Sequence, residues 1–246
     1  MRDLILSDIH ANWEGLTAVL EFARGQYDRI ICCGDVVGYG ANPNEAVVWV
    51  RENAAAVIRG NHDKVAAGLD SSDDFNPLAK RAALWTIDTL TPENHAWVRA
   101  LPAGPIDVGG YQIVHGSPYD EDEYLLGQFE VRRAMDVADG PLTFFGHTHL
   151  QGGFCTHQGR IMVLPPPEAD ESAYTVELEP DDCYLVNPGS TGQPRDGDWR
   201  AGAAIYDSEA RLVTLLRVPY DVKTAQRKIC DAGLPVPLAL RLATGS

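Results

Sequence analysis

Short apolar runs, each ending in a small residue or a polar turn, recur through the first 150 residues of the chain. Five of these runs have the composition and length of buried strands, and they cover residues 4–6, 29–33, 56–59, 111–114 and 142–145. Side chains that are able to bind a metal ion follow each run directly. Because sites in open α/β sheets form beyond the carboxyl ends of the strands, we predict that these five ends meet at one edge.

Helical start signals lie between the apolar runs. Asn12 precedes apolar residues with a 3.6-residue period, which predicts a helix that ends near Gly25. Three Asn-Pro or Thr-Pro pairs place a capping side chain before a proline, and they predict helices over residues 43–52, 77–89 and 92–100. The segment 120–139 is acidic at its start and helical towards its end, so we expect it to form a flap above the site.

The second half of the chain has a different pattern of short strands and turns. It predicts strands over residues 153–156, 161–164, 173–178, 183–187, 203–207 and 212–218, and a last helix over 220–230. The proline-rich, acidic residues 165–171 are typical of an exposed loop. We see no repeat and no linker composition, and therefore expect residues 1–246 to form a single domain of the α/β (α+β) class.

Composition and charge narrow the classes of function. A net charge of -15 argues against binding to a nucleic-acid duplex or an anionic membrane, since either needs a basic face. It leaves an anionic substrate possible, because bound divalent cations would invert the local field. No apolar run reaches the length of a signal peptide or a membrane span, so we expect a cytoplasmic location.

The five cysteines show no C-x-x-C spacing, which argues against a disulfide framework and a zinc-thiolate site. Cys32 and Cys33 are neighbours in an apolar run and would point to opposite faces of a strand, where both are expected to be core residues.

Seven carboxylate, imidazole and amide side chains after the strand-like runs are the candidate metal ligands. They are Asp8, His10, Asp35, Asn61, His115, His147 and His149. Asp8 and His10 are two residues apart, so in an extended segment their side chains would share one face and chelate one ion, and His147 and His149 have the same relation. Oxygen and nitrogen donors without thiolate suit manganese, iron, cobalt, nickel or zinc.

The motifs D-x-H, G-D-x-x-G, G-N-H-D, H-G and G-H-T-H, in this order, resemble the motif series of the calcineurin-like metallophosphoesterase superfamily. The resemblance covers residues 3–150 and continues in residues 187–190, and the segments 6–12 and 34–40 are similar to the small bacterial YfcE-like branch. It implies a four-layer αββα sandwich of two mixed β-sheets flanked by helices.

The resemblance also implies a role for each residue. Asp8, His10 and His149 would bind a first divalent transition-metal ion, Asn61, His115 and His147 a second, and Asp35 would bridge the two. Manganese is the first choice for the metal. A bridging water, whose pKa metal coordination can lower from 15.7 to about 7, would then attack phosphorus in line as hydroxide. His62 is the candidate for protonating the leaving alkoxide, with the alternative that it holds its loop by hydrogen bonding.

The sequence departs from the phosphoprotein-phosphatase branch of this superfamily. In that branch the G-D segment resembles G-D-x-x-D-R-G, whereas in this chain Gly38 and Tyr39 occupy the positions of its acid and its arginine. Arg195, in a turn-rich loop, is the candidate substitute for binding phosphate, and the alternative is a solvated loop arginine.

We therefore predict a metal-dependent phosphoric ester hydrolase that acts on a small phosphorylated substrate, either a phosphodiester or a phosphomonoester, with nucleotides among the candidates. A phosphoprotein phosphatase and a catalytically silent scaffold of the same fold remain the alternatives. A nuclease is disfavoured, because 20 Lys and Arg stand against 35 Asp and Glu. The sequence leaves the oligomeric state open, a homo-oligomer included.

Overall fold

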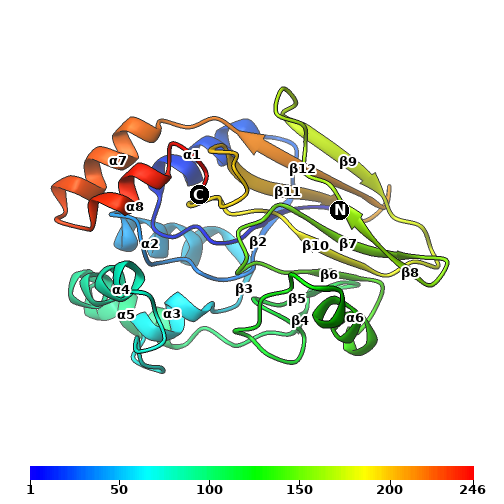
Figure 1. The fold of residues 1–246 in the computed structure, drawn as a ribbon, viewed down its shortest axis with the longest axis horizontal. Coiled ribbons are helices and arrows are strands. Elements are labelled where there is room, and N and C mark those ends of the chain that lie inside the picture. The colour runs from blue at the N-terminus through cyan, green and yellow to red at the C-terminus, as the bar shows by residue number, and fades with distance from the viewer.

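Two six-stranded mixed β-sheets form the centre of the protein, as the computed structural model of residues 1–246 shows (Figure 1). The first sheet has the order β3-β2-β1-β11-β12-β9. Its strands are β1 (Arg2–Leu6), β2 (Arg29–Cys32), β3 (Ala54–Val57), β9 (Ala173–Glu177), β11 (Ala201–Asp207) and β12 (Leu212–Val218). The strands β1 to β3 run parallel, and β11, β12 and β9 extend the sheet in antiparallel fashion.

The second sheet has the order β4-β5-β6-β10-β7-β8. Its strands are β4 (Ile106–Asp107), β5 (Gln112–Ile113), β6 (Leu142–Phe144), β7 (Gly152–His157), β8 (Arg160–Leu164) and β10 (Tyr184–Asn187). The central strands β5, β6 and β10 are parallel, whereas β4, β7 and β8 pair in antiparallel fashion. Both sheets therefore place a parallel group of strands, with all carboxyl ends at one edge, next to antiparallel strands.

Eight helices cover the outer faces of the two sheets. They are α1 (Trp13–Phe22), α2 (Pro43–Asn53), α3 (Asn61–Ala66), α4 (Pro77–Thr89), α5 (Pro92–Arg99), α6 (Gln128–Val137), α7 (Val222–Asp231) and α8 (Val236–Arg241). Figure 1 shows α6 apart from the other helices, beside the second sheet. Its apolar residues form a small core with that sheet, while a much larger core joins the first sheet to helices on its own side.

A third core fills the space between the two sheets. Alternation along the strands divides the side chains between these cores, since neighbouring residues of a strand point to opposite faces. Cys32 belongs to the core under the helices, and Cys33 belongs to the core between the sheets, as predicted. The layers are therefore helix, sheet, sheet, helix, which confirms the predicted αββα fold.

The predicted elements are present with small shifts of their ends, and three short elements were not predicted. These are α3, β4 and α8. Each has six residues or fewer, which is too short for a hydrophobic period to appear in the sequence. None of the helices combines the length and hydropathy that crossing a membrane requires.

Candidate metal centre

The seven candidate metal ligands lie at the carboxyl ends of strands from both sheets. They are Asp8 and His10 after β1, Asp35 after β2, Asn61 after β3, His115 after β5, and His147 and His149 after β6. The first three of these strands belong to one sheet and the other two to the second sheet. The site therefore spans the edge at which the parallel strands of both sheets end.

Asp8, His10, Asp35 and His149 form one compact group, in which one ligand atom from each lies within 4.8 Å of the others. The Nε2 atom of His149 lies 3.3 Å from Oδ1 of Asp8, and Nε2 of His10 lies 3.5 Å from Oδ2 of Asp35. All four side chains are buried. Burial raises the pKa of Asp8 to about 6, which is the expected response of a carboxylate removed from water beside a second carboxylate.

The imidazole rings of His10 and His149 point their Nε2 lone pairs at each other. The Nε2 atoms of His10 and His149 are 3.0 Å apart. The Nδ1 atoms contact the backbone carbonyls of Val37 and Gln193 at 3.0 and 2.6 Å. Because a carbonyl oxygen only accepts, each Nδ1 carries the proton, and each neutral ring offers a lone pair at Nε2. Two facing lone pairs repel each other, whereas a cation bound between them satisfies both, and the outward N–H bond is typical of metal-binding histidine.

A second group adjoins the first. The Oδ1 atom of Asn61 lies 3.3 Å from Nε2 of His115 and 3.0 Å from Nδ1 of His147. The other nitrogen of each ring lies 2.8 or 3.0 Å from a backbone carbonyl, as in the first group. Oδ2 of Asp35 is 3.5 Å from Nε2 of His115 and equally far from Nε2 of His10. Asp35 therefore contacts both groups, which is the position that a shared ligand needs.

The spacing of these inward-facing atoms fits divalent transition-metal ions. Two ligand atoms about 2.1 Å from one ion are separated by roughly 3.0 to 3.4 Å in octahedral or tetrahedral geometry. Six contacts between the facing nitrogens and oxygens range from 3.0 to 3.5 Å, and Nε2 of His10 lies 4.0 Å from Oδ1 of Asp8. The donors are nitrogen and oxygen only, which suits borderline first-row metals.

Backbone conformation at the site departs from the sequence prediction. Five of the candidate ligands have φ angles between +48° and +64°, namely Asp8, His10, Asp35, His147 and His149. For non-glycine residues this left-handed region costs about 1 kcal/mol or more each, and such residues cluster at functional sites. The prediction that the D-x-H and H-x-H pairs lie in extended segments is therefore wrong, although Asp8 and His10 still belong to one group. The two histidines of the H-T-H segment turn to different groups instead.

Charge and burial compete in setting the histidine pKa values. Burial lowers the pKa of His147 to about 3 and holds the pKa values of His10 and His149 well below their usual range. These rings are neutral at neutral pH and keep their lone pairs. Burial alone would also lower the pKa of His115, but the adjacent carboxylate of Asp35 outweighs it and raises the pKa to about 10. The same contact holds the pKa of Asp35 far below its usual value.

His62 lies against the first group at the start of α3. Its backbone N–H donates to Oδ1 of Asp35 at 2.9 Å, and its ring lies between the rings of Tyr39 and Phe75, with centroids 4.3 and 4.6 Å away. Burial lowers the pKa of His62 to about 4. The Nδ1 atom has no hydrogen-bond partner and faces Gly38. The alternative that this side chain holds its loop by hydrogen bonding therefore finds no support.

Asp63 holds this loop instead, a role that the sequence prediction missed. Its buried carboxylate accepts hydrogen bonds from the backbone N–H groups of Gly60, Val36 and Val37 at 3.0, 3.2 and 3.1 Å. These bonds join the turn after β2 to the start of α3, which fixes the spacing between the two segments that carry candidate ligands. The position three residues after the N-cap Gly60 was the available signal, because an acid there caps a helix.

Arg195 lies in the loop between β10 and β11, half-buried beside the first group. Its Nη2 atom donates to the Tyr39 hydroxyl at 3.2 Å, and the Tyr39 ring lies 4.7 Å from the ring of His10. After burial, the positive charge of Arg195 is the largest influence that lowers the pKa of His149. This arginine is therefore close to the candidate metal centre and is not a freely solvated loop residue.

The segment 117–141, which includes the expected flap at residues 120–139, forms one wall beside the second group. The ring of Tyr124 stacks on His147 with centroids 4.0 Å apart, and the carbonyl oxygen of Asp122 lies 3.0 Å from Nε2 of the same histidine. Glu121 anchors the segment through two hydrogen bonds from Arg59 at 2.9 and 3.0 Å. The later part of the segment is α6, which packs on the second sheet.

Comparison with known proteins gives matches over nearly the whole chain. The profile of the calcineurin-like phosphoesterase superfamily domain matches residues 1–211. An uncharacterized protein of Methanocaldococcus jannaschii is 36% identical over 254 residues, covering 98% of this chain and 97% of that protein. The crystal structure of a metallophosphoesterase from Sphaerobacter thermophilus is 37% identical, covers 100% of this chain and 99% of its own, and has a TM-score of 0.86.

A more distant crystal structure extends the likeness of the fold. A hypothetical protein from Pyrococcus horikoshii is 20% identical, covers 100% of this chain and 98% of its own, and has a TM-score of 0.78. At that identity the likeness bears on the fold alone.

Proposed function

This chain belongs to the calcineurin-like phosphoesterase superfamily, and on that premise we propose that it is a metal-dependent hydrolase of small phosphate esters with two divalent cations in its site. One observation carries the proposal. Four histidines each have one ring nitrogen at a backbone carbonyl and the other facing inward, towards the oxygens of Asp8, Asp35 and Asn61. This arrangement is expensive in a metal-free protein and favourable around cations.

Each of the two groups of side chains would hold one cation of the proposed site. Asp8, His10 and His149 would hold one cation, Asn61, His115 and His147 the other, and Asp35 would contact both. Bound cations would polarise the phosphoryl group and make water nucleophilic near neutral pH. Manganese is our first choice, with iron, nickel, cobalt and zinc as alternatives, because the donors are nitrogen and oxygen only.

Two further residues would act on the substrate. Arg195 would bind phosphate of the substrate, which its place beside Tyr39 and its lack of a carboxylate partner support. His62 would donate a proton to the leaving alkoxide, since its ring is adjacent to that of His10 at 4.9 Å and makes no hydrogen bond within the protein. The negative charge of a bound phosphate ester would raise the pKa of His62 from the low value that burial sets.

A small-molecule substrate is favoured over a phosphoprotein. Gly38 leaves the Nδ1 atom of His62 without the orienting acid that the phosphoprotein-phosphatase motif would supply. The site is also partly walled by Tyr124 and the rest of the segment 117–141. A silent scaffold is disfavoured because all seven ligand positions are filled and brought together.

The test is hydrolysis of bis-p-nitrophenyl phosphate and p-nitrophenyl phosphate by purified protein with Mn²⁺, with a phosphopeptide in parallel. We expect metal-dependent turnover of at least one nitrophenyl ester, and loss of nearly all of it in Asp35→Asn together with loss of bound metal. Asp28→Asn is the matched control, because Asp28 is exposed and pairs only with Arg2. Metal-loaded protein without turnover of either ester would contradict the proposal and favour the scaffold, whereas faster turnover of the phosphopeptide would favour the phosphoprotein phosphatase.

A further inference from the structure

Two arginines beside the proposed site have no carboxylate partner. Arg195 and Arg241 are both half-buried, and neither lies within ion-pair distance of an acid. Several other half-buried arginines of this acidic protein are paired, for example Arg29 with Asp3 and Arg59 with Glu121. With 35 acidic residues in the chain, two neighbouring guanidinium groups without an acid are an unusual arrangement.

The two guanidinium groups converge on one neutral oxygen. Nη2 of Arg195 lies 3.5 Å and Nη1 of Arg241 lies 3.3 Å from Oε1 of Gln193. Since both nitrogens lie within 3.5 Å of the same atom, they are no more than about 7 Å apart. Burial and the charge of Arg195 lower the pKa of Arg241, as expected for two cations that repel each other. An anion bound between them would remove this repulsion.

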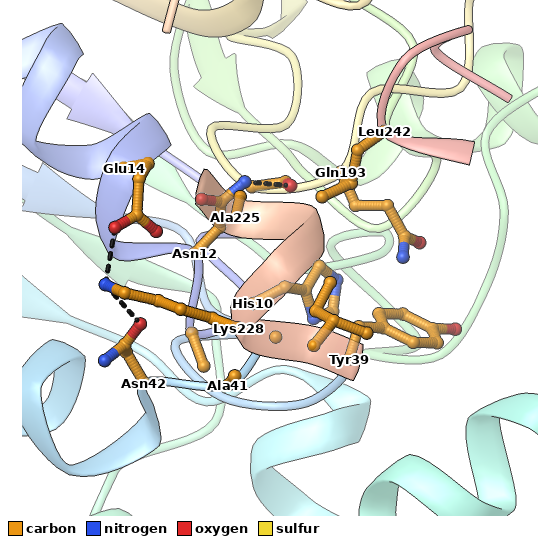
Figure 2. A pocket seen from close by; sticks show the side chains of 14 residues that line it. His10, Asn12, Glu14, Tyr39, Ala41, Asn42, Gln193, Ala225, Lys228 and Leu242 are labelled. Carbon is orange, nitrogen blue, oxygen red and sulfur yellow. Dashed lines mark hydrogen bonds and ion pairs between the residues drawn. The ribbon is translucent and has the colours of Figure 1, made fainter. Parts of the chain in front are cut away.

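This arginine pair is continuous with the candidate metal centre. The backbone carbonyl of Gln193 accepts the hydrogen bond from Nδ1 of His149, and Arg195 contacts Tyr39, whose ring lies against His10. His10, Tyr39, Gln193 and Lys228 are among the residues that line a pocket next to the candidate metal centre. Figure 2 shows the side chains of Gln193 and Tyr39 directed to the same side of this pocket, away from Lys228. An anion held by both arginines would therefore lie next to a phosphoryl group at the metal centre.

We propose that Arg195 and Arg241 together bind a second phosphoryl group of the substrate, adjacent to the one that is hydrolysed. Guanidinium groups bind phosphoryl oxygens through two parallel N–H bonds, and Gln193 holds both groups in place before the substrate arrives. The substrate class is then a compound with two linked phosphoryl groups, such as a nucleoside diphosphate or triphosphate. The inference rests on the proposed function, which it deepens, but the arginine pair can be tested separately.

The test compares two non-hydrolysable ligands by isothermal titration calorimetry on Mn²⁺-loaded protein, with the same free Mn²⁺ in cell and syringe. Methylenediphosphonate carries two phosphonate groups, and methylphosphonate carries one. We expect the wild-type protein to bind the diphosphonate at least tenfold more tightly. Arg241→Gln should reduce that preference about tenfold, the range of one lost charge-assisted hydrogen-bond pair, and leave methylphosphonate binding within twofold. Arg241→Lys keeps the charge but loses the planar fork, so its preference for the diphosphonate should lie between those of the wild type and Arg241→Gln.

Arg227→Gln is the matched control. Arg227 lies on the neighbouring helix α7, is exposed, and contacts only the hydroxyl of Thr224, so the substitution removes the same charge without touching the arginine pair. It should leave both affinities unchanged. A wild-type preference that survives in both Arg241 variants overturns the inference, and so does an equal loss for the two ligands in Arg241→Gln. Absence of nitrophenyl ester hydrolysis in the same wild-type preparation would instead overturn the proposed function alone.

Discussion

Replacing Gly38 with alanine tests the role of His62 without changing any proposed metal ligand. Gly38 has φ +95°, and a Cβ atom added there would lie 2.6 Å from Nδ1 and 3.0 Å from Cγ of His62. The ring cannot swing away freely, because it is buried between the rings of Tyr39 and Phe75. The substitution should therefore displace the imidazole by pushing directly on it.

The size of the effect follows from these distances. Ordinary contact between heavy atoms begins near 3.5 Å, so the ring must move by roughly 1 Å to relieve the clash. A misplacement of about 1 Å in a catalytic group can cost about 100-fold in rate. The positive φ adds a loss of about 1 kcal/mol in the free energy of unfolding. We expect kcat to fall about 100-fold, while the metal content stays at the wild-type value.

Gly109→Ala separates displacement of the ring from backbone strain. Gly109 also has φ +95°, but no atom lies within 4 Å of the Cβ position. Its alanine variant should lose about 1 kcal/mol of stability and keep full activity. Steady-state hydrolysis, metal analysis and urea unfolding of both variants provide the comparison. If Gly38→Ala retains wild-type kcat within threefold, the reasoning that places His62 in catalysis is refuted.

Two further predictions concern the framework of the site and its metals. Asn187 is fully buried and donates to the Gly146 carbonyl and the Thr148 hydroxyl at 2.9 and 3.0 Å. Asn187→Ala should therefore lower the free energy of unfolding, measured by urea titration, by about 2 to 3 kcal/mol and weaken metal binding. The exposed control Asn53→Ala should change neither. Adding Mn²⁺ at about 100 times its dissociation constant should stabilise the chelator-treated protein by about 2.7 kcal/mol, or roughly 5 to 10 °C in melting temperature. That rise should be absent in Asp35→Asn, and an equal rise in the variant would contradict the assignment of Asp35 to the metal centre.

The ligand set could be predicted from the sequence because each candidate ligand directly follows a strand. An apolar run that ends at Asp8, Asp35 or His115 also fixes where that side chain lies once parallel strands align. The extended backbone conformation predicted for the paired ligands was wrong, however. The spacing of Asp8 and His10 suggested an extended segment, but both residues adopt positive φ angles, which only the surrounding packing can impose.

Residues that act through distant contacts carried no such signal. Asp63 was visible as a neighbour of His62, but its three bonds to backbone N–H groups depend on how the turn after β2 meets α3. Arg241 lies beyond residues 1–211, which the family profile matches, in a helix too short to predict. Its approach to Gln193 joins positions 48 residues apart in the chain.

By itself, the sequence determined the order of all but three short strands and helices, the identity of the seven candidate ligands and the family to which the chain belongs. These properties are local, since hydrophobic periods, caps and short motifs act over a few residues. Only the tertiary structure decided the left-handed backbone at five of the ligands, which contacts hold their loops, and that Arg195 and Arg241 meet at Gln193. Those are contacts between segments far apart in the chain, and their geometry arises from the packing of two sheets and their helices.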